Sequence, residues 1–228
     1  MKDRTTNTLF MLSSLDGKIN SGASDELDVD KDWKNINGIK EGLKQYYDIE
    51  KTTDLFSFIT GRTLEKIGTN NIKNIPSKTE VSFIVVDNKQ HLNKNGIKYF
   101  SNLAKKLIIV TTNENYNTYN YDNVDIIYYE GNIDFEDLFR KIKTNYNASN
   151  VTIQSGGTLN GVLLRAKLID YVNIVIAPVL VGGKNTPTLV DGESIMKEID
   201  LNKLGVLELV ECKVLKDSYV NLKYKVIS

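Results

Sequence analysis

Apolar runs of strand length alternate along the chain with segments that show helical spacing. Apolar residues three or four positions apart predict helices between several of these runs. The predicted strands are Thr8–Leu12, Leu55–Thr60, Val81–Val86, Leu107–Thr111, Val124–Tyr129, Val151–Gln154 and Tyr171–Ala177, and the predicted helices are Gly96–Lys105, Phe135–Asn145 and Gly157–Ala166. Strands that alternate with helices predict an α/β fold with a mostly parallel sheet flanked by helices.

The last part of the chain follows a different pattern. Leu207–Leu215 and Tyr219–Ile227 each alternate apolar and polar residues on either side of Lys216-Asp217-Ser218. This pattern predicts an antiparallel C-terminal hairpin. With 228 residues the chain can bury a full core, so we expect a single domain over residues 1–228.

The balanced charge and the short apolar stretches argue against nucleic acid and membranes as partners. Lys and Arg total 29, as do Asp and Glu, so no net field draws the molecule to nucleic acid or to an anionic membrane. The longest apolar stretches, such as Val172–Val181, are shorter than the ~20 residues of a membrane-spanning helix. Residues 1–5 lead into a short apolar run that is no secretory signal, and there is one cysteine, so we expect a cytoplasmic protein.

One histidine and one cysteine are too few to build a zinc site. A zinc site needs about three or four protein ligands, so we expect no metal. His91 lies in a polar stretch and is predicted to be a solvated loop residue rather than half of a Cys-His dyad. Cys212 lies among alternating apolar residues and is predicted to be a core or half-buried side chain.

A pair of glycines follows the strand that ends near Gln154. Gly156 and Gly157 are followed at once by the predicted helix that begins Gly157-Thr158-Leu159. Glycines let the backbone approach a ligand closely, and the N–H groups of the first turn attract an anion such as a pyrophosphate. The alternative interpretation is an ordinary tight turn between strand and helix.

Three further motifs also follow strands. They are Ser13-Ser14-Leu15-Asp16-Gly17-Lys18-Ile19, Thr60-Gly61-Arg62-Thr63, and Val181-Gly182-Gly183-Lys184. Ligands of open α/β sheets gather at the carboxyl ends of the strands, and Arg62 has a planar fork suited to phosphate. For each motif alone, a simple turn is at least as good an interpretation.

Taken in order, these motifs resemble one family. Ser14–Ile19, Gly156–Asn160 and the long run Ile176–Glu193 are similar to the pyrimidine reductases of riboflavin synthesis, and most of all to the stand-alone archaeal-type diaminopyrimidine reductases. The resemblance implies a dihydrofolate-reductase-like fold and a homodimer. It also implies that NADPH passes a hydride to C1′ of a ribosylaminopyrimidine phosphate, whose ring-opened imine becomes a ribityl amine.

The resemblance also assigns roles to residues of this chain. Lys18 and Asp16 would be catalytic, with Lys18 positioning or protonating the imine. The residues expected at the cofactor are Gly61, Arg62, Thr63, Asp87, Asn88, Lys89, Gly156, Gly157, Thr158 and Leu159, with Lys89 near the 2′-phosphate. Ser14, Gln154 and Gly183 would contact the substrate.

The chain departs from the family pattern on the substrate side. Gln154-Ser155-Gly156 stands where these reductases usually have Glu-Gly-Gly, and Lys66–Asn71 replaces a stretch that recognises substrate. The four arginines, which are Arg4, Arg62, Arg140 and Arg165, offer no clear grip for a substrate phosphate. Two alternatives therefore stay open: a dihydrofolate-reductase-like enzyme acting on a pterin or another carbonyl or imine, and a nucleotide-binding protein without turnover.

Overall fold

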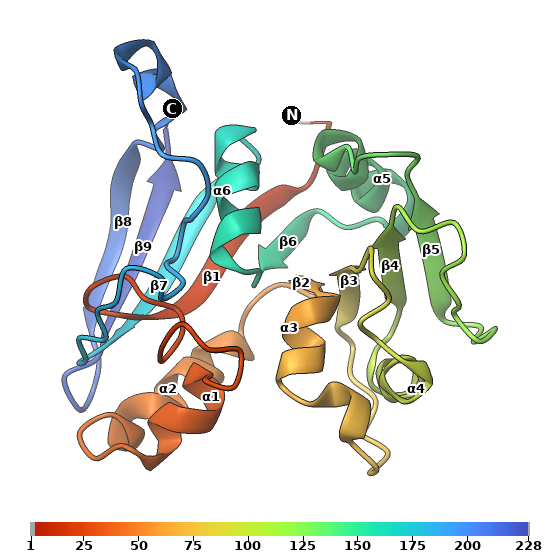
Figure 1. Cartoon of the computed structure of the whole chain (residues 1–228), viewed down its shortest axis with the longest axis horizontal. Coiled ribbons are helices and arrows are strands. Elements are labelled where there is room, and N and C mark those ends of the chain that lie inside the picture. The colour runs from red at the N-terminus through yellow and green to blue at the C-terminus, as the bar shows by residue number, and fades with distance from the viewer. Residues whose placement is uncertain (1–2, 228) are drawn as a thin grey trace. The chain divides into compact units, whose positions relative to one another are not determined.

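The computed structural model describes residues 3–227, so residues 1, 2 and 228 of the expected single domain lie outside it. The described chain forms two compact units (Figure 1). The first unit holds the residues up to Thr6 and Asp54–Ser155, and the second holds Asn7–Thr53 and the residues from Gly156 onward. The expectation of a single domain stays a prediction.

The first unit contains a parallel sheet of five strands. The strands are β2 (Phe56–Thr60), β3 (Ser82–Val86), β4 (Leu107–Thr111), β5 (Val124–Tyr128) and β6 (Asn150–Ile153). They lie in the order β5-β4-β3-β2-β6, and each neighbouring pair is parallel. The helices of this unit are α3 (Gly61–Lys66), α4 (Lys94–Leu103), α5 (Phe135–Tyr146) and the short 3-10 helix η2 (Thr69–Asn71).

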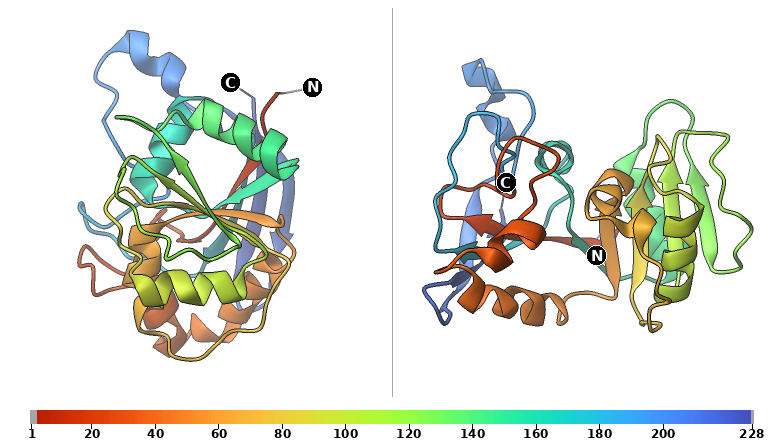
Figure 2. Two further views of the ribbon diagram at one scale, coloured as in Figure 1. Left: turned by 90° about the vertical axis from the view of Figure 1, so that its right-hand side faces the viewer. Right: turned by 60° about the horizontal axis from the view of Figure 1, so that its bottom comes forward.

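Helices cover both faces of this sheet. On one face, Val85 and Ile109 pack with Leu64 of α3 and Phe100 of α4. Side chains alternate between the faces of a strand, so Phe58 of β2, which pairs with Ile84, points to the other face. The Phe58 ring lies 5.5 Å from the Phe139 ring of α5. Figure 2 shows α4 and α5 on opposite sides of these strands.

The second unit contains parallel and antiparallel strands. The strands are β1 (Thr6–Ser14), β7 (Tyr171–Ala177), β8 (Leu207–Val214) and β9 (Val220–Val226). They lie in the order β1-β7-β9-β8; β1 pairs with β7 in parallel, and the other two pairs are antiparallel. The helices are α1 (Val29–Asp32), η1 (Trp33–Asn35), α2 (Lys40–Glu50), α6 (Gly157–Arg165) and η3 (Glu198–Lys203).

The core of the second unit forms between this sheet and α2. Trp33 and Tyr46 pack with Phe10 of β1 and Val175 of β7, and all four are buried. The rings of Phe10 and Tyr46 are stacked, with centroids 5.1 Å apart. Neither α1 nor α2 was predicted from the sequence.

The predicted α/β fold, with a mostly parallel sheet flanked by helices and a C-terminal antiparallel hairpin, is confirmed. Two strands match their predicted bounds, Leu107–Thr111 and Tyr171–Ala177. The hairpin turn places Asp217 and Ser218 at φ 54° and 64°, the left-handed backbone of the tight turns that suit the twist of paired strands. None of the described helices is both long and apolar enough to cross a membrane.

One prediction for this part of the chain is wrong. Cys212 is exposed rather than in the core or half-buried. It lies on β8, which is the last strand in the order and is mostly exposed. The alternating pattern therefore predicted the strand but not its exposure.

Candidate functional site

The start of α6 is the best-defined part of the candidate site in the second unit. Gly157 is buried, and its Cα abuts the Thr188 carbonyl and the Asp191 carboxylate so closely that a side chain would collide with both. A Cβ on Gly156 would meet nothing within 4 Å. Gly157 is therefore required by close packing, whereas Gly156 faces open space.

Residues 188–191 hold this helix start in place. The Asp191 N–H donates to the Gly157 carbonyl at 2.9 Å, and the Asn160 amide donates to the Leu189 carbonyl at 2.8 Å. The Asp191 carboxylate in turn accepts from the Thr188 N–H at 3.2 Å and from its hydroxyl at 2.5 Å. The first turn of α6 is thus a fixed element.

The opposite side of that first turn is available to a ligand. Gly156 and Thr158 are exposed, and no side chain caps the helix at Gly156. The first N–H groups of an α-helix have no partner within the helix, and the helix dipole makes this end attractive to anions. This nine-residue helix can therefore bind a phosphate group through its backbone.

The carboxylate of Asp16 accepts hydrogen bonds from the turn that contains Val181 and Gly182. It accepts from the Ser14 hydroxyl at 2.5 Å, the Val181 N–H at 3.1 Å and the Gly182 N–H at 2.6 Å. These hydrogen bonds, led by that of Ser14, lower the pKa of Asp16 to about 2. At neutral pH Asp16 is therefore a carboxylate and no proton donor.

Lys18 ties the same two segments together. Its ammonium donates to the carbonyl oxygens of Gly183 at 2.8 Å and Thr186 at 3.0 Å. Gly183 has φ +82°, which suits a glycine, and this turn brings its carbonyl to the lysine. The structure thus brings together four predicted site residues, Ser14, Asp16, Lys18 and Gly183, around one turn.

In the first unit, the predicted cofactor residues lie after β2 and β3. The Thr60 hydroxyl accepts from the Thr63 N–H at 3.2 Å and caps α3, and Arg62 in the first turn is exposed. A side chain on Gly61 would collide with the Asp87 carboxylate. Glycine is therefore needed at 61 because the end of β3 packs directly against it.

Asp87 is buried, and both oxygens of its carboxylate accept hydrogen bonds from other residues of the protein. Oδ1 accepts from the His91 N–H, and Oδ2 accepts from the Leu92 N–H and the Tyr116 hydroxyl. The His91 Nδ1 lies 2.9 Å from Oδ1. His91 lies in a loop as predicted. Its side chain is only 24% exposed rather than fully solvated, because the ring folds back onto Asp87.

The neighbours of Asp87 are more open. Asn88 and Lys89 are exposed, and the Asn88 Oδ1 accepts from the Thr112 N–H at 2.9 Å. Gln154 is half-buried at the end of β6, where its Oε1 accepts from the Ser57 hydroxyl at 3.3 Å. Burial of Tyr116, together with the Asp87 charge, raises the pKa of its hydroxyl.

Three residues that shape the candidate site were not predicted from the sequence: Thr188, Asp191 and Tyr116. The run Gly182–Glu193 contains the first two and was noted for its resemblance, but nothing in it indicated that Asp191 packs on Gly157. Tyr116 lies in an Asn-rich stretch with no recognisable signal. Among the described residues, no group of three His, Cys, Asp or Glu side chains could hold a metal ion.

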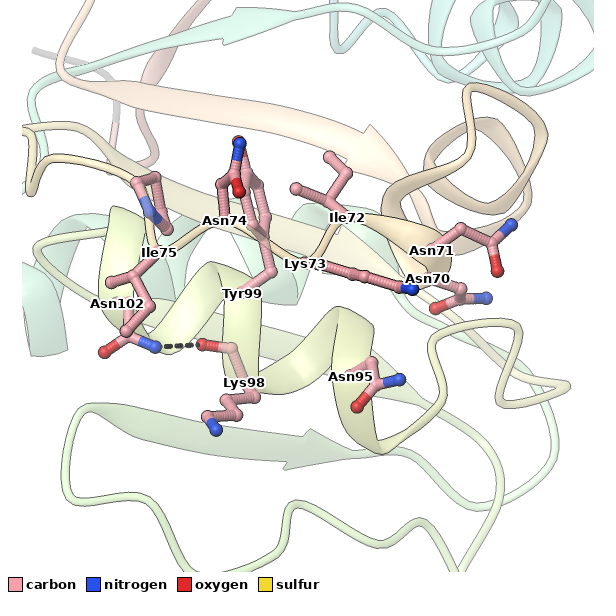
Figure 3. Close-up of a pocket in the computed structure, with 11 residues that line it drawn as sticks. Asn70, Asn71, Ile72, Lys73, Asn74, Ile75, Asn95, Lys98, Tyr99 and Asn102 are labelled. Atoms are coloured by element: carbon pink, nitrogen blue, oxygen red, sulfur yellow. Dashed lines mark hydrogen bonds between the residues drawn. The ribbon is translucent and has the colours of Figure 1, made fainter.

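A separate pocket lies in the first unit, between α4 and the chain that follows η2 (Figure 3). Its volume is about 390 Å³. It is lined by Asn70, Asn71, Ile72, Lys73, Asn74, Ile75, Pro76, Asn95, Lys98, Tyr99 and Asn102. None of the predicted site residues lines it.

A family model described as the RibD C-terminal domain matches residues 6–219, which is nearly the whole chain. The chain belongs to this family. The match spans both units and every predicted site residue, from Ser14 to Gly183. The predicted resemblance to the riboflavin-pathway reductases is confirmed.

A curated relative supports the same family. The 2,5-diamino-6-ribosylamino-4(3H)-pyrimidinone 5′-phosphate reductase of Methanothermobacter thermautotrophicus is 44% identical over 52 residues. These residues cover 23% of this chain and 24% of the relative. The aligned part therefore spans about a quarter of that protein's length.

Two solved structures share the fold. Acinetobacter baumannii RibD has a TM-score of 0.72 at 17% identity, covering 100% of this chain and 59% of that one. The riboflavin biosynthesis reductase Rib7 of Saccharomyces cerevisiae has a TM-score of 0.65 at 18% identity, covering 100% and 92%. At these identities the likeness establishes the fold of the RibD-type reductases for this chain.

Proposed function

We propose that this protein is an NADPH-dependent reductase of a ribosylaminopyrimidine phosphate in riboflavin synthesis. A hydride would reach C1′ of the ring-opened imine and give a ribityl amine. The observation that supports this most is the exposed, uncapped first turn of α6, locked from behind by residues 188–191. Such a turn suits a dinucleotide pyrophosphate, and the chain belongs to a family whose named relatives include reductases.

The cofactor residues follow from what each unit exposes. Gly156, Gly157 and Thr158, with Leu159 behind them, would bind the pyrophosphate through the backbone N–H groups of the helix start. Bound NADPH would supply the hydride. On the adenosine side, we assign Arg62 after Gly61, with Thr63 ordering the turn, and Asn88 and Lys89 after β3. Lys89 suits a 2′-phosphate because its ammonium is exposed on a short loop.

Lys18 is proposed as the residue that acts on the imine. An ammonium has three N–H donors, and two of those of Lys18 are used by the carbonyls of Gly183 and Thr186. The third donor is left for a substrate nitrogen or oxygen, and the two carbonyls fix its direction. A fixed cation beside the reacting atoms favours charge development without reorganisation.

Ser14 and Asp16 are proposed to support Lys18. The Ser14 hydroxyl is buried, donates to Asp16 and accepts from the Lys18 N–H at 2.8 Å. This hydroxyl therefore orders the turn that carries the lysine. Gln154 and Gly183 remain the proposed substrate contacts, with an amide at 154 in place of the carboxylate usual in the family.

Cofactor and substrate assays test the proposal. NADPH binding is measured by the change in its fluorescence, and turnover by loss of its absorbance at 340 nm with the diaminopyrimidine and aminouracil ribosyl phosphates supplied separately. We expect oxidation with one of them and tighter binding of NADPH than of NADH. Binding without oxidation would instead support a non-catalytic nucleotide-binding protein, and oxidation only with a pterin would support the other reductase.

We also propose a homodimer in the cytoplasm. Leu207, Leu209 and Val214 of β8 are 41%, 55% and 84% exposed and pair with Val226, Tyr224 and Val220 of β9 on one face of the sheet. A second copy of this chain would cover these residues, because exposed apolar patches at a sheet edge favour association. Light scattering should give twice the mass of 25.7 kDa, and Leu209→Lys should halve it. A monomeric wild-type protein would contradict this.

A further inference from the structure

The buried carboxylate of Asp87 closes the loop that follows β3. Its side chain is 0% exposed. Oδ1 lies 2.9 Å from both the backbone nitrogen and the Nδ1 of His91, while Oδ2 accepts from the Leu92 N–H at 3.0 Å and from the Tyr116 hydroxyl at 2.8 Å. A carboxylate has about four lone-pair positions, and all of them are used here when the His91 Nδ1 carries its proton. Asp87 therefore has no acceptor left for a ribose hydroxyl.

These contacts fix residues 88–91 at both ends. The Asp87 carbonyl accepts from the Thr111 hydroxyl at 2.9 Å, and the His91 carbonyl accepts from the Asn70 amide at 2.8 Å. Between them, Gln90 has φ 53°, a left-handed conformation that non-glycine residues adopt only when their surroundings hold it. The contacts of the Asp87 carboxylate, together with these two hydrogen bonds, thus hold the loop in one conformation.

What this loop presents outward is polar and basic. The Asn88 Oδ1 is used by the Thr112 N–H, so its amide nitrogen is the group that remains to face a ligand. Lys89 is exposed, and no ion pair is found for it within residues 3–227. Lys89 belongs to the four-residue loop 88–91. This loop begins directly after Asp87 and ends at His91, which contacts the Asp87 carboxylate.

We infer that Asp87 is a positioning residue, acting with His91 and Tyr116 to hold Lys89 where it selects a dinucleotide that carries a 2′-phosphate. This inference rests on the proposed function. Asp87 does not touch the cofactor. Tyr116 comes from the segment after β4 and Gly61 from the start of α3, so the carboxylate joins three segments of the first unit. Loss of one partner loosens the loop, and a mobile lysine discriminates less between NADPH and NADH.

Tyr116→Phe tests the inference, because it removes one donor and keeps the ring. Tyr129→Phe is the matched control, since the Tyr129 hydroxyl also donates to a carboxylate, that of Asp137, at 2.8 Å in the same unit. We expect Tyr116→Phe to raise the Kd for NADPH by about tenfold and that for NADH by less than about threefold, as one lost hydrogen bond to a charged group allows. The control should leave both unchanged.

Amide hydrogen exchange in the absence of cofactor measures the mobility of the loop directly. Residues 88–91 should exchange faster in Tyr116→Phe than in the wild type, and the α5 amides should not change. A second variant, His91→Phe, removes the ring nitrogen and should shift the NADPH preference in the same direction. The two changes should be less than additive together, since both act on one carboxylate.

The outcomes separate the two proposals. If the wild-type protein binds NADPH no better than NADH, the proposed cofactor preference fails, and this inference fails with it. If the wild type prefers NADPH and Tyr116→Phe keeps that preference despite faster exchange at 88–91, the inference alone is overturned. Unchanged exchange in both variants would also overturn it, because the loop would then not depend on Asp87.

Discussion

The ammonium of Lys18 lies 2.8 Å from the carbonyl oxygen of Gly183, although 165 residues separate them. This hydrogen bond joins the turn after β1 to the turn after β7, and the β1–β7 pairing brings the two turns to the same edge. The contact gives Lys18 a fixed direction. It also means that a change at Lys18 alters the Gly183 turn as well as the charge.

Replacement of Lys18 should therefore affect turnover far more than cofactor binding. We expect Lys18→Met to lower kcat by more than about 100-fold, while the Kd for NADPH changes less than about threefold, because the cofactor residues of α6 are held by other contacts. Absorbance at 340 nm measures turnover, and fluorescence titration measures binding.

Lys18→Arg is the control for the charge. Its guanidinium keeps a cation and can still bond a carbonyl, but its planar fork cannot reproduce the position of the ammonium. We expect activity between those of the wild type and Lys18→Met. Full activity in Lys18→Met would remove Lys18 from the mechanism.

Asp16 should give a measurable acid dependence of stability. The pKa of its carboxyl is lowered to about 2 in the folded protein, from an ordinary value of 3.8, chiefly by the Ser14 hydroxyl and the Val181 N–H. A carboxyl group whose pKa is lower in the folded than in the unfolded protein stabilises the folded state at pH values above its unfolded pKa. That stabilisation is lost as the pH falls from about 4 to about 2.

The measurement is urea unfolding of the wild type and Asp16→Asn across this range. The difference in the free energy of unfolding should be constant above about pH 5 and should shrink as the pH is lowered. Glu114→Gln serves as the control, since Glu114 is an exposed carboxylate with no hydrogen bond or ion pair found within residues 3–227. A difference that grows toward low pH would contradict the assignment.

Tyr219 anchors the hairpin to the segment before α2. Its side chain is buried, and its hydroxyl donates to the Ile39 carbonyl at 2.7 Å. Tyr219→Phe should lower the free energy of unfolding by about 1–2 kcal/mol, because the Ile39 carbonyl loses a partner in the core. Tyr224→Phe, on the half-exposed face of β9, should change it by less than about 0.5 kcal/mol. Equal effects of the two variants would be inconsistent with the hydrogen bond.

The sequence was informative where burial alone determines the pattern. Tyr171–Ala177 is a β-branched apolar run buried inside a sheet, and its bounds were predicted to the residue. The helix α2 was missed, although Ile39, Leu43 and Tyr46 follow helical spacing and are buried together. Its polar residues and Gly42 dilute the apolar periodicity, and what makes it a helix is packing against β1 and β7.

For the candidate site, the sequence indicated which elements carry the residues but not which other residues they contact. The sequence indicated that Gly156 and Gly157 lie where a strand meets a helix, since local chemistry decides this. It could not indicate that Asp191 packs on Gly157, because the contact depends on the tertiary fold. Nor could it distinguish an Asp87 that faces a ligand from one that faces inward, as local sequence does not determine the direction of a carboxylate.

The two glycines at the start of α6 offer the sharpest test of the site. A methyl group on Gly157 would meet the Thr188 backbone carbonyl, which cannot move without displacing residues 188–191. We expect Gly157→Ala to lower the free energy of unfolding by about 1–3 kcal/mol through overpacking and to weaken NADPH binding, because the helix start shifts. Urea unfolding and fluorescence titration measure the two effects.

Gly156→Ala is the matched variant. Gly156 has φ −70° and ψ 157°, which alanine adopts freely, and its added methyl group would meet nothing within 4 Å. Its stability should stay within about 0.5 kcal/mol of the wild type. NADPH binding should nevertheless weaken if the phosphate lies against the exposed side of this turn. Loss of binding in Gly156→Ala without loss of stability would thus localise the ligand, whereas unchanged binding would place it elsewhere.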